Sequence, residues 1–215
     1  MGFGRTDAGV HAKGQVAAMD LSHPIPVDKL LLALNANLPE DIRIYEVWEA
    51  EADFHPRFAA KRKTYEYTVF EGAVQPPEIR RYSWHVTGDA IDVGRMREAA
   101  VCLIGEHDFR AFRSSGGMNL STVRQVYAAE ILEETVSAPN GRLIRIRVTG
   151  NGFLYNMVRI IAGTLVRIGQ GRLDKDSVRQ ALLCGERSLL GETAPAKGLC
   201  LLGVEYDTPE TAENP

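Results

Sequence analysis

The segment at residues 153–168 constrains the fold more than any other part of this sequence. It follows a Gly-Asn-Gly run, is predicted to form one helix, and carries apolar residues on nearly every side. A helix that is apolar all round is buried on most of its faces, so the rest of the chain has to cover it. Arg159 lies in the middle of this helix. A buried guanidinium needs a carboxylate or phosphate partner, unless its stem carries the charge out to solvent.

The remaining chain alternates between strand-like and helix-like segments. Strands are predicted at residues 15–19, 42–48, 64–70, 82–86, 123–133, 143–148 and 199–206. Further helices are predicted between Pro26 and Pro39, from the capping Asp92 to about Gly105, and over residues 177–183. Asn140-Gly141 accepts positive φ angles and therefore favours a hairpin between residues 123–133 and 143–148. This order predicts an α+β protein with an antiparallel sheet and helices packed on one face.

Composition narrows the class of protein. The chain has 215 residues, 45% of them hydrophobic, which is enough for one large domain or two small ones. No apolar run approaches the roughly 18 residues of a membrane span, and the N-terminus lacks a secretory pattern, so the cytoplasm is the expected location. Cys102, Cys184 and Cys200 are isolated, and the five histidines lack ligand spacing. We therefore expect no metal site.

Charge is segregated along the chain. The net charge of -3 gives no bulk attraction to nucleic acid, yet residues 141–173 contain six arginines and no acid, and a second basic stretch comprises Arg57, Lys61, Arg62 and Lys63. Such runs are often only solvated surface. Tyr65 begins a strand directly after the second stretch, and an aromatic ring beside basic residues can stack a base while its phosphate is held. A strand Tyr alone is more often part of a core.

Asp7 lies in a loop flanked by glycines, where a backbone can approach a ligand closely and a carboxylate can project into a cleft. It is a plausible counter-charge for Arg159. A carboxylate kept ionised by an arginine suits a nucleophile or an electrostatic stabiliser better than a general acid. An isolated Thr-Asp-x-Gly is more commonly a turn in which the Asp bonds local backbone, and this interpretation also stays open.

Four segments carry a more specific signal together than separately. They are GRTDAGVHA at residues 4–12, FHPRFAAKRKTYEY at 54–67, GFLYNMVR at 152–159 and TAPAKGL at 193–199. In this order they resemble the motifs of TruA-type tRNA pseudouridine synthases, and the resemblance runs from Gly4 to about Tyr206.

The resemblance implies a pseudouridine synthase fold, in which two ferredoxin-like halves share a mixed, mainly antiparallel sheet with an RNA cleft between them. The halves would be residues 1–71, carrying the Asp loop, and residues 72–207, followed by a disordered tail at 208–215. It also implies a homodimer that acts on the anticodon stem-loop of tRNA. The reaction would convert uridine to pseudouridine at positions 38, 39 and 40, without a cofactor or a metal.

Residue roles carry over by motif. Asp7 would be the catalytic carboxylate, Arg159 its ion-pair partner and Tyr65 a base-stacking and proton-transfer residue, while Leu199 would form an apolar wall and Arg5 would help to extrude the target base. Further substrate contacts would come from His11, Arg57, Lys61, Arg62 and Lys63. The target uridine has to be flipped out of the stem-loop before its glycosidic bond is reached. Asp7 then either attacks ribose C1′ or removes the C2′ proton to give a glycal, and the sequence leaves both routes open.

Family members have a further strand and helix before the Asp loop, whereas Met1-Gly2-Phe3 leads almost directly into it. We therefore expect an incomplete N-terminal half, with low stability or unusual pairing if the natural chain starts here. One alternative is a catalytically impaired protein that binds tRNA or helps RNA to fold. Another is a different Asp-dependent glycosidic enzyme, which would normally need a second carboxylate with a raised pKa.

Overall fold

The computed structural model describes residues 2, 6–116, 121–136 and 141–207. These residues form two compact units. The first contains Gly2 and residues 16–59, and the second contains residues 6–15 and the described residues from 60 to 207. The predicted Asn140 of the hairpin turn and the predicted tail at 208–215 lie outside the described residues.

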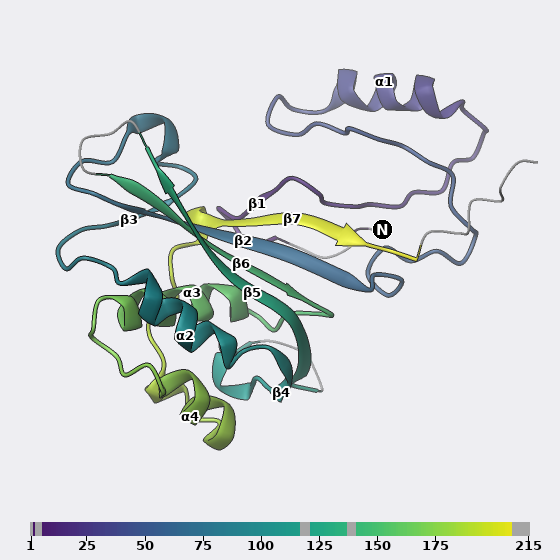
Figure 1. The fold of residues 1–215 in the computed structure, drawn as a ribbon. Coiled ribbons are helices and arrows are strands. Elements are labelled where there is room, and N and C mark those ends of the chain that lie inside the picture. The colour runs from purple at the N-terminus through teal and green to yellow at the C-terminus, as the bar shows by residue number, and fades with distance from the viewer. Residues whose placement is uncertain (1, 3–5, 117–120, 137–140, 208–215) are drawn as a thin grey trace, which may run out of the picture. The chain divides into compact units, whose positions relative to one another are not determined.

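The first unit contains the helix α1 (Val27–Asn37), shown in Figure 1. Pro26 precedes it, and the fixed φ of proline suits a helix start. The helix ends where the backbone N–H of Leu38 donates to the carbonyl of Leu34, one residue before Pro39. The predicted helix is confirmed, although Leu30 is its one buried residue.

The two strands predicted in this unit were wrong. At residues 15–19 the described chain has one isolated bridge, between Gly2 and Ala17, and residues 42–48 form no strand. A strand needs a neighbouring strand for its hydrogen bonds. At Ile44 a side chain takes that place, because Asn35 Nδ2 donates to the Ile44 carbonyl at 2.8 Å and Asn35 Oδ1 accepts from its N–H at 2.9 Å. The apolar side chains here stay exposed, with Tyr45 at 81%.

The second unit is built on a mixed sheet. Its strands are β1 (His11–Ala12), β2 (Arg62–Glu71), β3 (Trp84–Val86), β4 (Gly105–Asp108), β5 (Val123–Thr135), β6 (Arg142–Gly150) and β7 (Leu199–Glu205). The described strands follow the order β1-β7-β2-β6-β5-β4, with β3 beside β2. The β1–β7 and β2–β3 pairs are parallel and the other pairs are antiparallel. This confirms the predicted mixed, mainly antiparallel sheet and the hairpin of β5 and β6.

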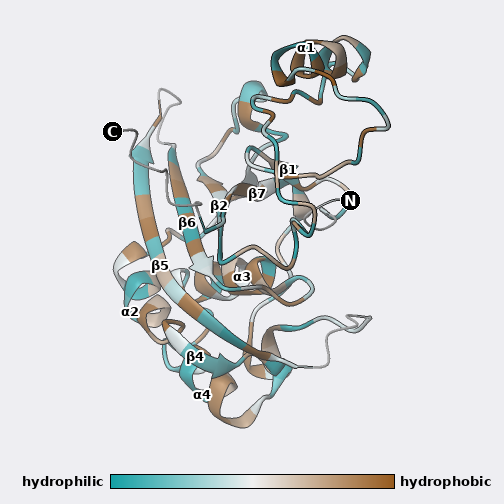
Figure 2. Cartoon of the chain, turned by 90° about the vertical axis from the view of Figure 1, so that its right-hand side faces the viewer, coloured by the Kyte–Doolittle hydropathy of each residue, from teal (hydrophilic) through white to brown (hydrophobic). Residues whose placement is uncertain are grey.

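Helices α2 (Val93–Val101), α3 (Met157–Gly169) and α4 (Ser177–Cys184) lie on one face of this sheet, as predicted (Figure 1). Short 3-10 helices occur at Pro77–Ile79, Arg110–Phe112, Arg187–Leu189 and Ala196–Gly198. In Figure 2, β5 and β6 carry alternating hydrophobic and hydrophilic segments, because one face of each strand meets the helices. None of the helices in the described part of the chain is long and apolar enough to cross a membrane.

Two helix boundaries differ from the prediction. The Asp92 side chain accepts from Arg95 N–H at 3.1 Å and caps α2 as expected, but α2 ends before Gly105, whose φ of 117° instead opens β4. The central helix α3 starts at Met157 rather than at residue 153, because Asn156 is left-handed with φ 62°. All residues of α3 except Arg159 and Arg167 are buried. The prediction that this helix is buried on most of its faces is therefore confirmed.

Candidate active site

Asp7 lies at the start of a tight turn. Its carbonyl accepts from the Val10 N–H at 3.0 Å, and Gly9 has φ 81°, the left-handed conformation that the third residue of a type II turn requires. The chain then forms β1, which runs parallel to Cys200–Leu201 of β7. Lys13 N–H adds a hydrogen bond to the Leu201 carbonyl at 2.8 Å. The support for the Asp loop thus comes from the C-terminal strand β7.

Arg159 projects from α3 toward this loop. Its Nε donates to the Ala194 carbonyl at 2.7 Å, and its Nη1 donates to Asn156 Oδ1 at 2.9 Å. The same Nη1 lies 4.0 Å from Asp7 Oδ2, within range for charge attraction but longer than a hydrogen bond. The side chain of Arg159 is 18% exposed and that of Asp7 is 42% exposed. The predicted pair is therefore brought together, although neutral oxygens make the shortest contacts to the guanidinium.

The segment at residues 193–199 connects these parts. The Ala194 N–H donates to the Arg159 carbonyl at 3.1 Å, and Tyr67 Oη donates to the Pro195 carbonyl at 2.7 Å. Burial raises the pKa of Tyr67, so its phenol keeps the proton that it donates. A β-carbon placed on Gly9 would lie 3.6 Å from that of Ala196, so the Asp loop packs directly on this segment. Leu199, the predicted apolar wall, is buried at the start of β7.

Tyr65 lies on β2 between β6 and β7, where its ring meets Phe153 edge to face with centroids 5.2 Å apart. Burial and, to a lesser degree, the negative charge of Asp7 raise the pKa of Tyr65 to about 12. The phenol therefore remains protonated near neutral pH and can donate a proton or a hydrogen bond.

A model of the family described as "tRNA pseudouridine synthase" matches residues 99–207. A tRNA pseudouridine synthase A of Geobacter sulfurreducens is 46% identical over 203 residues, which cover 94% of this chain and 80% of the relative. The chain belongs to the tRNA pseudouridine synthase family. Relatives of the same name from Thermoanaerobacter sp. and Limosilactobacillus fermentum are each 43% identical, over 96% and 99% of this chain and 82% and 81% of their own lengths. A second model, described as "Uncharacterized protein conserved in bacteria (DUF2344)", matches residues 6–100.

The match to the pseudouridine synthase model begins at residue 99, so it includes Arg159 and Leu199 but neither Asp7 nor Tyr65. The roles of Asp7 and Tyr65 therefore rest on the motifs and on the geometry described above. Among the described residues no three His, Cys, Asp or Glu side chains are grouped as metal ligands would be. The expectation of catalysis without metal or cofactor stays a prediction.

Lys63 and Arg124 of the second unit converge, and Arg62 adjoins Lys63 on β2; we define these three cations as the basic strip. The Arg62 guanidinium lies 4.8 Å from the centre of the Tyr127 ring. A β-carbon placed on Gly152 would lie 3.4 Å from Arg124 Nε and 3.8 Å from Lys63 Nζ, so these two cations converge on one glycine. Sequence analysis missed Arg124. The predicted strand at residues 123–133 contained it, and extending the partner strand beyond residue 148 would have placed it near the Gly-Asn-Gly run.

The remaining predicted contacts are more scattered. Lys61 Nζ pairs with Asp207 Oδ2 at 2.8 Å, and His11 Nε2 lies 2.9 Å from the Arg81 carbonyl. Arg57 belongs to the first unit, where its guanidinium lies 5.8 Å from the centre of the Phe58 ring. Arg5 lies outside the described residues.

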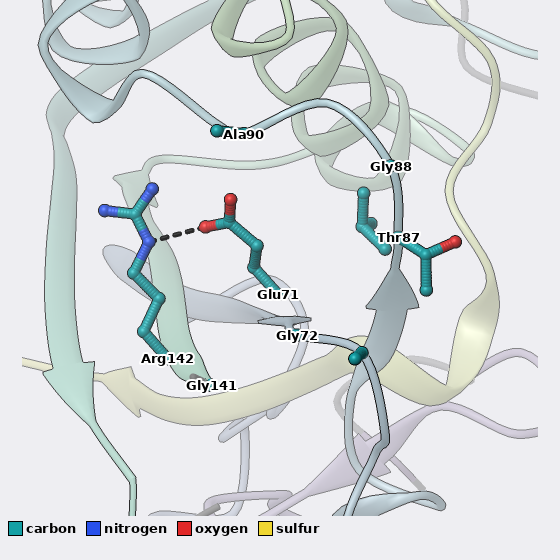
Figure 3. A pocket seen from close by; sticks show the side chains of 9 residues that line it. Glu71, Gly72, Thr87, Gly88, Ala90, Gly141 and Arg142 are labelled. Atoms are coloured by element: carbon teal, nitrogen blue, oxygen red, sulfur yellow. Dashed lines mark hydrogen bonds and ion pairs between the residues drawn. The ribbon is translucent and has the colours of Figure 1, made fainter. Parts of the chain in front are cut away.

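A separate pocket of about 520 Å³ lies at the far end of β2 and β6 (Figure 3). Its lining residues are Glu71, Gly72, Ala73, Val86, Thr87, Gly88, Ala90, Gly141 and Arg142, none of them a predicted site residue. The Arg142 guanidinium donates to Glu71, to Glu133 and to the Ile91 carbonyl, so each of its three nitrogens already has a partner. Arg142 is therefore already engaged by the protein and is not available to a ligand in the pocket. We assign the pocket no role in the chemistry.

Proposed function

We propose that this chain isomerises uridine to pseudouridine in tRNA, with Asp7 as the catalytic carboxylate. Family membership supports the reaction, since relatives named tRNA pseudouridine synthase A match this chain over about four fifths of their length. The observation that carries the proposal for Asp7 is its approach to Arg159. A carboxylate and a guanidinium from distant parts of the sequence lie 4.0 Å apart, and the charge of that carboxylate helps to raise the pKa of the half-buried Tyr65.

Arg159 would act as a fixed positive charge that orients the carboxylate. Its guanidinium is held by the Ala194 carbonyl and the Asn156 side chain, so it needs little rearrangement when substrate binds. Asp7 would then face the ribose of the flipped uridine and stabilise the positive charge that develops on the sugar as the glycosidic bond breaks. Attack on C1′ and removal of the C2′ proton both suit this arrangement.

Tyr65 would stack on the uracil, its neutral phenol would donate a hydrogen bond, and the motif resemblance adds a role in proton transfer. The basic strip would hold phosphates of the RNA near the site. Leu199 would close the pocket on its apolar side, and His11, Arg57 and Lys61 would add contacts to the RNA. Arg5 would help to extrude the target base.

The finer assignments rest on the motif resemblance. We propose the anticodon stem-loop as the substrate region, with positions 38, 39 and 40 as targets. We propose a homodimer as the working form, and the cytoplasm as the location because tRNA is modified there. The two-half organisation with a boundary near residue 71 is also a proposal.

The competing function is a protein that binds tRNA or helps it to fold without modifying it. One observation favours it: Asp7 is 42% exposed and lies beyond hydrogen-bond distance from Arg159. A carboxylate held this loosely gives less transition-state stabilisation than one fixed in position.

Tritium release separates the two functions. A tRNA labelled at uridine C5 loses tritium to water when pseudouridine forms, so the wild-type chain should release it and Asp7→Asn should not, while both bind tRNA equally. Asp89→Asn is the matched control, because Asp89 forms an exposed pair with Arg172 at 2.8 Å, and it should release tritium normally. Full release by Asp7→Asn would exclude Asp7 as the catalytic residue. Tight tRNA binding without release by the wild type would support the binding function. Substrates with a single uridine at 38, 39 or 40 would test the positions.

A further inference from the structure

Asn156 has an unusual backbone conformation directly before α3. Its φ of 62° is the one positive value at a non-glycine position among the described residues. Asparagine tolerates this conformation better than most residues, although glycine tolerates it best. The backbone alone would therefore accept glycine here, and the presence of a side chain calls for another explanation.

The side chain does not do what an asparagine at a helix start usually does. Such a residue normally accepts a hydrogen bond from a backbone N–H in the first turn. Asn156 makes no such capping bond to α3. Its Oδ1 accepts from Arg159 Nη1 at 2.9 Å, and its Nδ2 donates to Ser114 Oγ at 3.1 Å.

Arg159, which can only donate, fixes which end of the Asn156 amide faces it, and Ser114 pairs with the other end. The backbone N–H of Ser114 donates to the Tyr155 carbonyl at 3.2 Å, which ties its loop to the residue before Asn156. With Nδ2 directed at the serine hydroxyl, Oδ1 is left for the guanidinium. The reversed amide would place an NH₂ group against the donors of Arg159, which have no acceptor to offer.

Nη1 of Arg159 carries two hydrogens. One is used by Asn156 Oδ1, and the nearest carboxylate oxygen to this nitrogen, Asp7 Oδ2, lies 4.0 Å away. We propose that Asn156 is a positioning residue for the isomerisation, whose side-chain oxygen holds Arg159 so that the second Nη1 hydrogen faces Asp7. This inference rests on the proposed function for its catalytic consequence, but not for its geometry.

Asn156→Gly is the informative substitution, because it keeps the left-handed backbone and removes only the amide. In single-turnover tritium release at saturating enzyme we expect the rate to fall by about 10- to 100-fold, the scale of a misplaced catalytic group, with tRNA affinity unchanged within about twofold. Asn156→Asp keeps an acceptor oxygen and can still bond the Ser114 hydroxyl. It should recover most of the lost rate.

Asp92→Ala is the control for nonspecific destabilisation. It removes the side-chain cap of α2, whose oxygen accepts from Arg95 N–H, and should lower stability without slowing the reaction of folded protein. Release by Asn156→Gly within about twofold of the wild type would overturn the proposal. Equal losses in the Gly and Asp variants would also overturn it, because the oxygen would then not be the relevant group.

A second measurement keeps the inference testable even if the wild type releases no tritium, an outcome that would refute the proposed function alone. Nitrogen-15 NMR of arginine side chains reports rotation of the guanidinium, with the Arg159 signals assigned by their loss in Arg159→Lys. Rotation should be slow in the wild type and in Asn156→Asp, and faster in Asn156→Gly. The same rotation rate in all three proteins would refute the positioning role.

Discussion

A single methyl group added at Gly163 would test whether α3 and the segment at residues 193–199 act together around Arg159. A β-carbon at Gly163 would lie 1.9 Å from the Glu192 carbonyl oxygen and 3.0 Å from its carbon. Carbon and oxygen atoms in packed proteins stay more than about 3 Å apart, and a backbone carbonyl cannot rotate away as a side chain can. The helix and the backbone at Glu192, which leads directly into this segment, therefore have to separate by more than about 1 Å.

The magnitude follows from three contributions. Alanine favours a helix over glycine by about 1 kcal/mol. Against this, overpacking costs about 1–3 kcal/mol, and losing the 2.7 Å hydrogen bond from Arg159 Nε to the Ala194 carbonyl costs about 1.5–3 kcal/mol more, because its donor is charged. The Gly163→Ala protein should thus be destabilised by about 1.5–5 kcal/mol in urea unfolding. Its tritium release should also slow about tenfold or more, because Arg159 loses one of its two fixed partners.

Gly94→Ala provides the matched control, since Gly94 also lies in a helix but faces only the end of the Asp92 side chain, at 3.0 Å. Its unfolding free energy should stay within about 1 kcal/mol of the wild type, and its activity should be unchanged. If Gly163→Ala were as stable and as active as Gly94→Ala, the close packing of α3 on the Glu192 backbone would not control Arg159. The reasoning would then be refuted.

Four further predictions concern titration, stability and RNA binding. Asp7→Asn should lower the pKa of Tyr65 from about 12, since the Asp7 charge helps to raise it. Tyrosinate absorbance during a pH titration measures this pKa, with Tyr65→Phe as the reference. An unchanged pKa would show that the Asp7 charge does not act on Tyr65. Because the folded pKa exceeds the unfolded value near 10, the stability that Tyr65 contributes should be complete below pH 10 and be lost as the pH rises toward 12. Glu66→Gln should lower the unfolding free energy by about 1–3 kcal/mol, because this buried carboxylate lies between two arginines. Urea unfolding measures the difference, and a variant more stable than the wild type would contradict the prediction. Arg124→Gln should reduce the slope of the logarithm of the tRNA binding constant against the logarithm of salt concentration by about 0.7–1. Arg179→Gln on α4 is the control and should leave the slope unchanged. Equal slopes in the two variants would show that Arg124 does not contact a phosphate.

Sequence patterns predicted those elements whose signals are local. The apolar central helix, the hairpin of β5 and β6 and the Asp92 cap are confirmed, because periodicity, turn residues and capping chemistry act within a few residues. The strands at 15–19 and 42–48 failed for a nonlocal reason. Their composition suits a strand, but a strand also needs a partner, and the side chain of Asn35 bonds the backbone at Ile44 instead.

The candidate site shows the same division. Arg159 could be singled out because a charge in an apolar helix is unusual, and Asp7 because its loop matches a motif and offers that charge a partner. Asn156 could not, since the predicted helix at residues 153–168 included it as an ordinary helical residue. Its bond to Ser114 depends on a left-handed backbone and on a loop far away in the sequence. Neither is visible in local periodicity.

The contacts of Arg159 suggest how one residue can serve both folding and chemistry. Its charge is largely buried and must be satisfied, and the Ala194 carbonyl and the Asn156 amide do this at hydrogen-bond distance without a second charge. Asp7 is therefore not needed to complete the core. Held at 4.0 Å and partly exposed, its carboxylate is oriented by the positive charge but not occupied by it. A tight bidentate pair would have engaged both carboxylate oxygens. Because other oxygens satisfy the arginine at hydrogen-bond distance, the carboxylate of Asp7 stays available to a substrate.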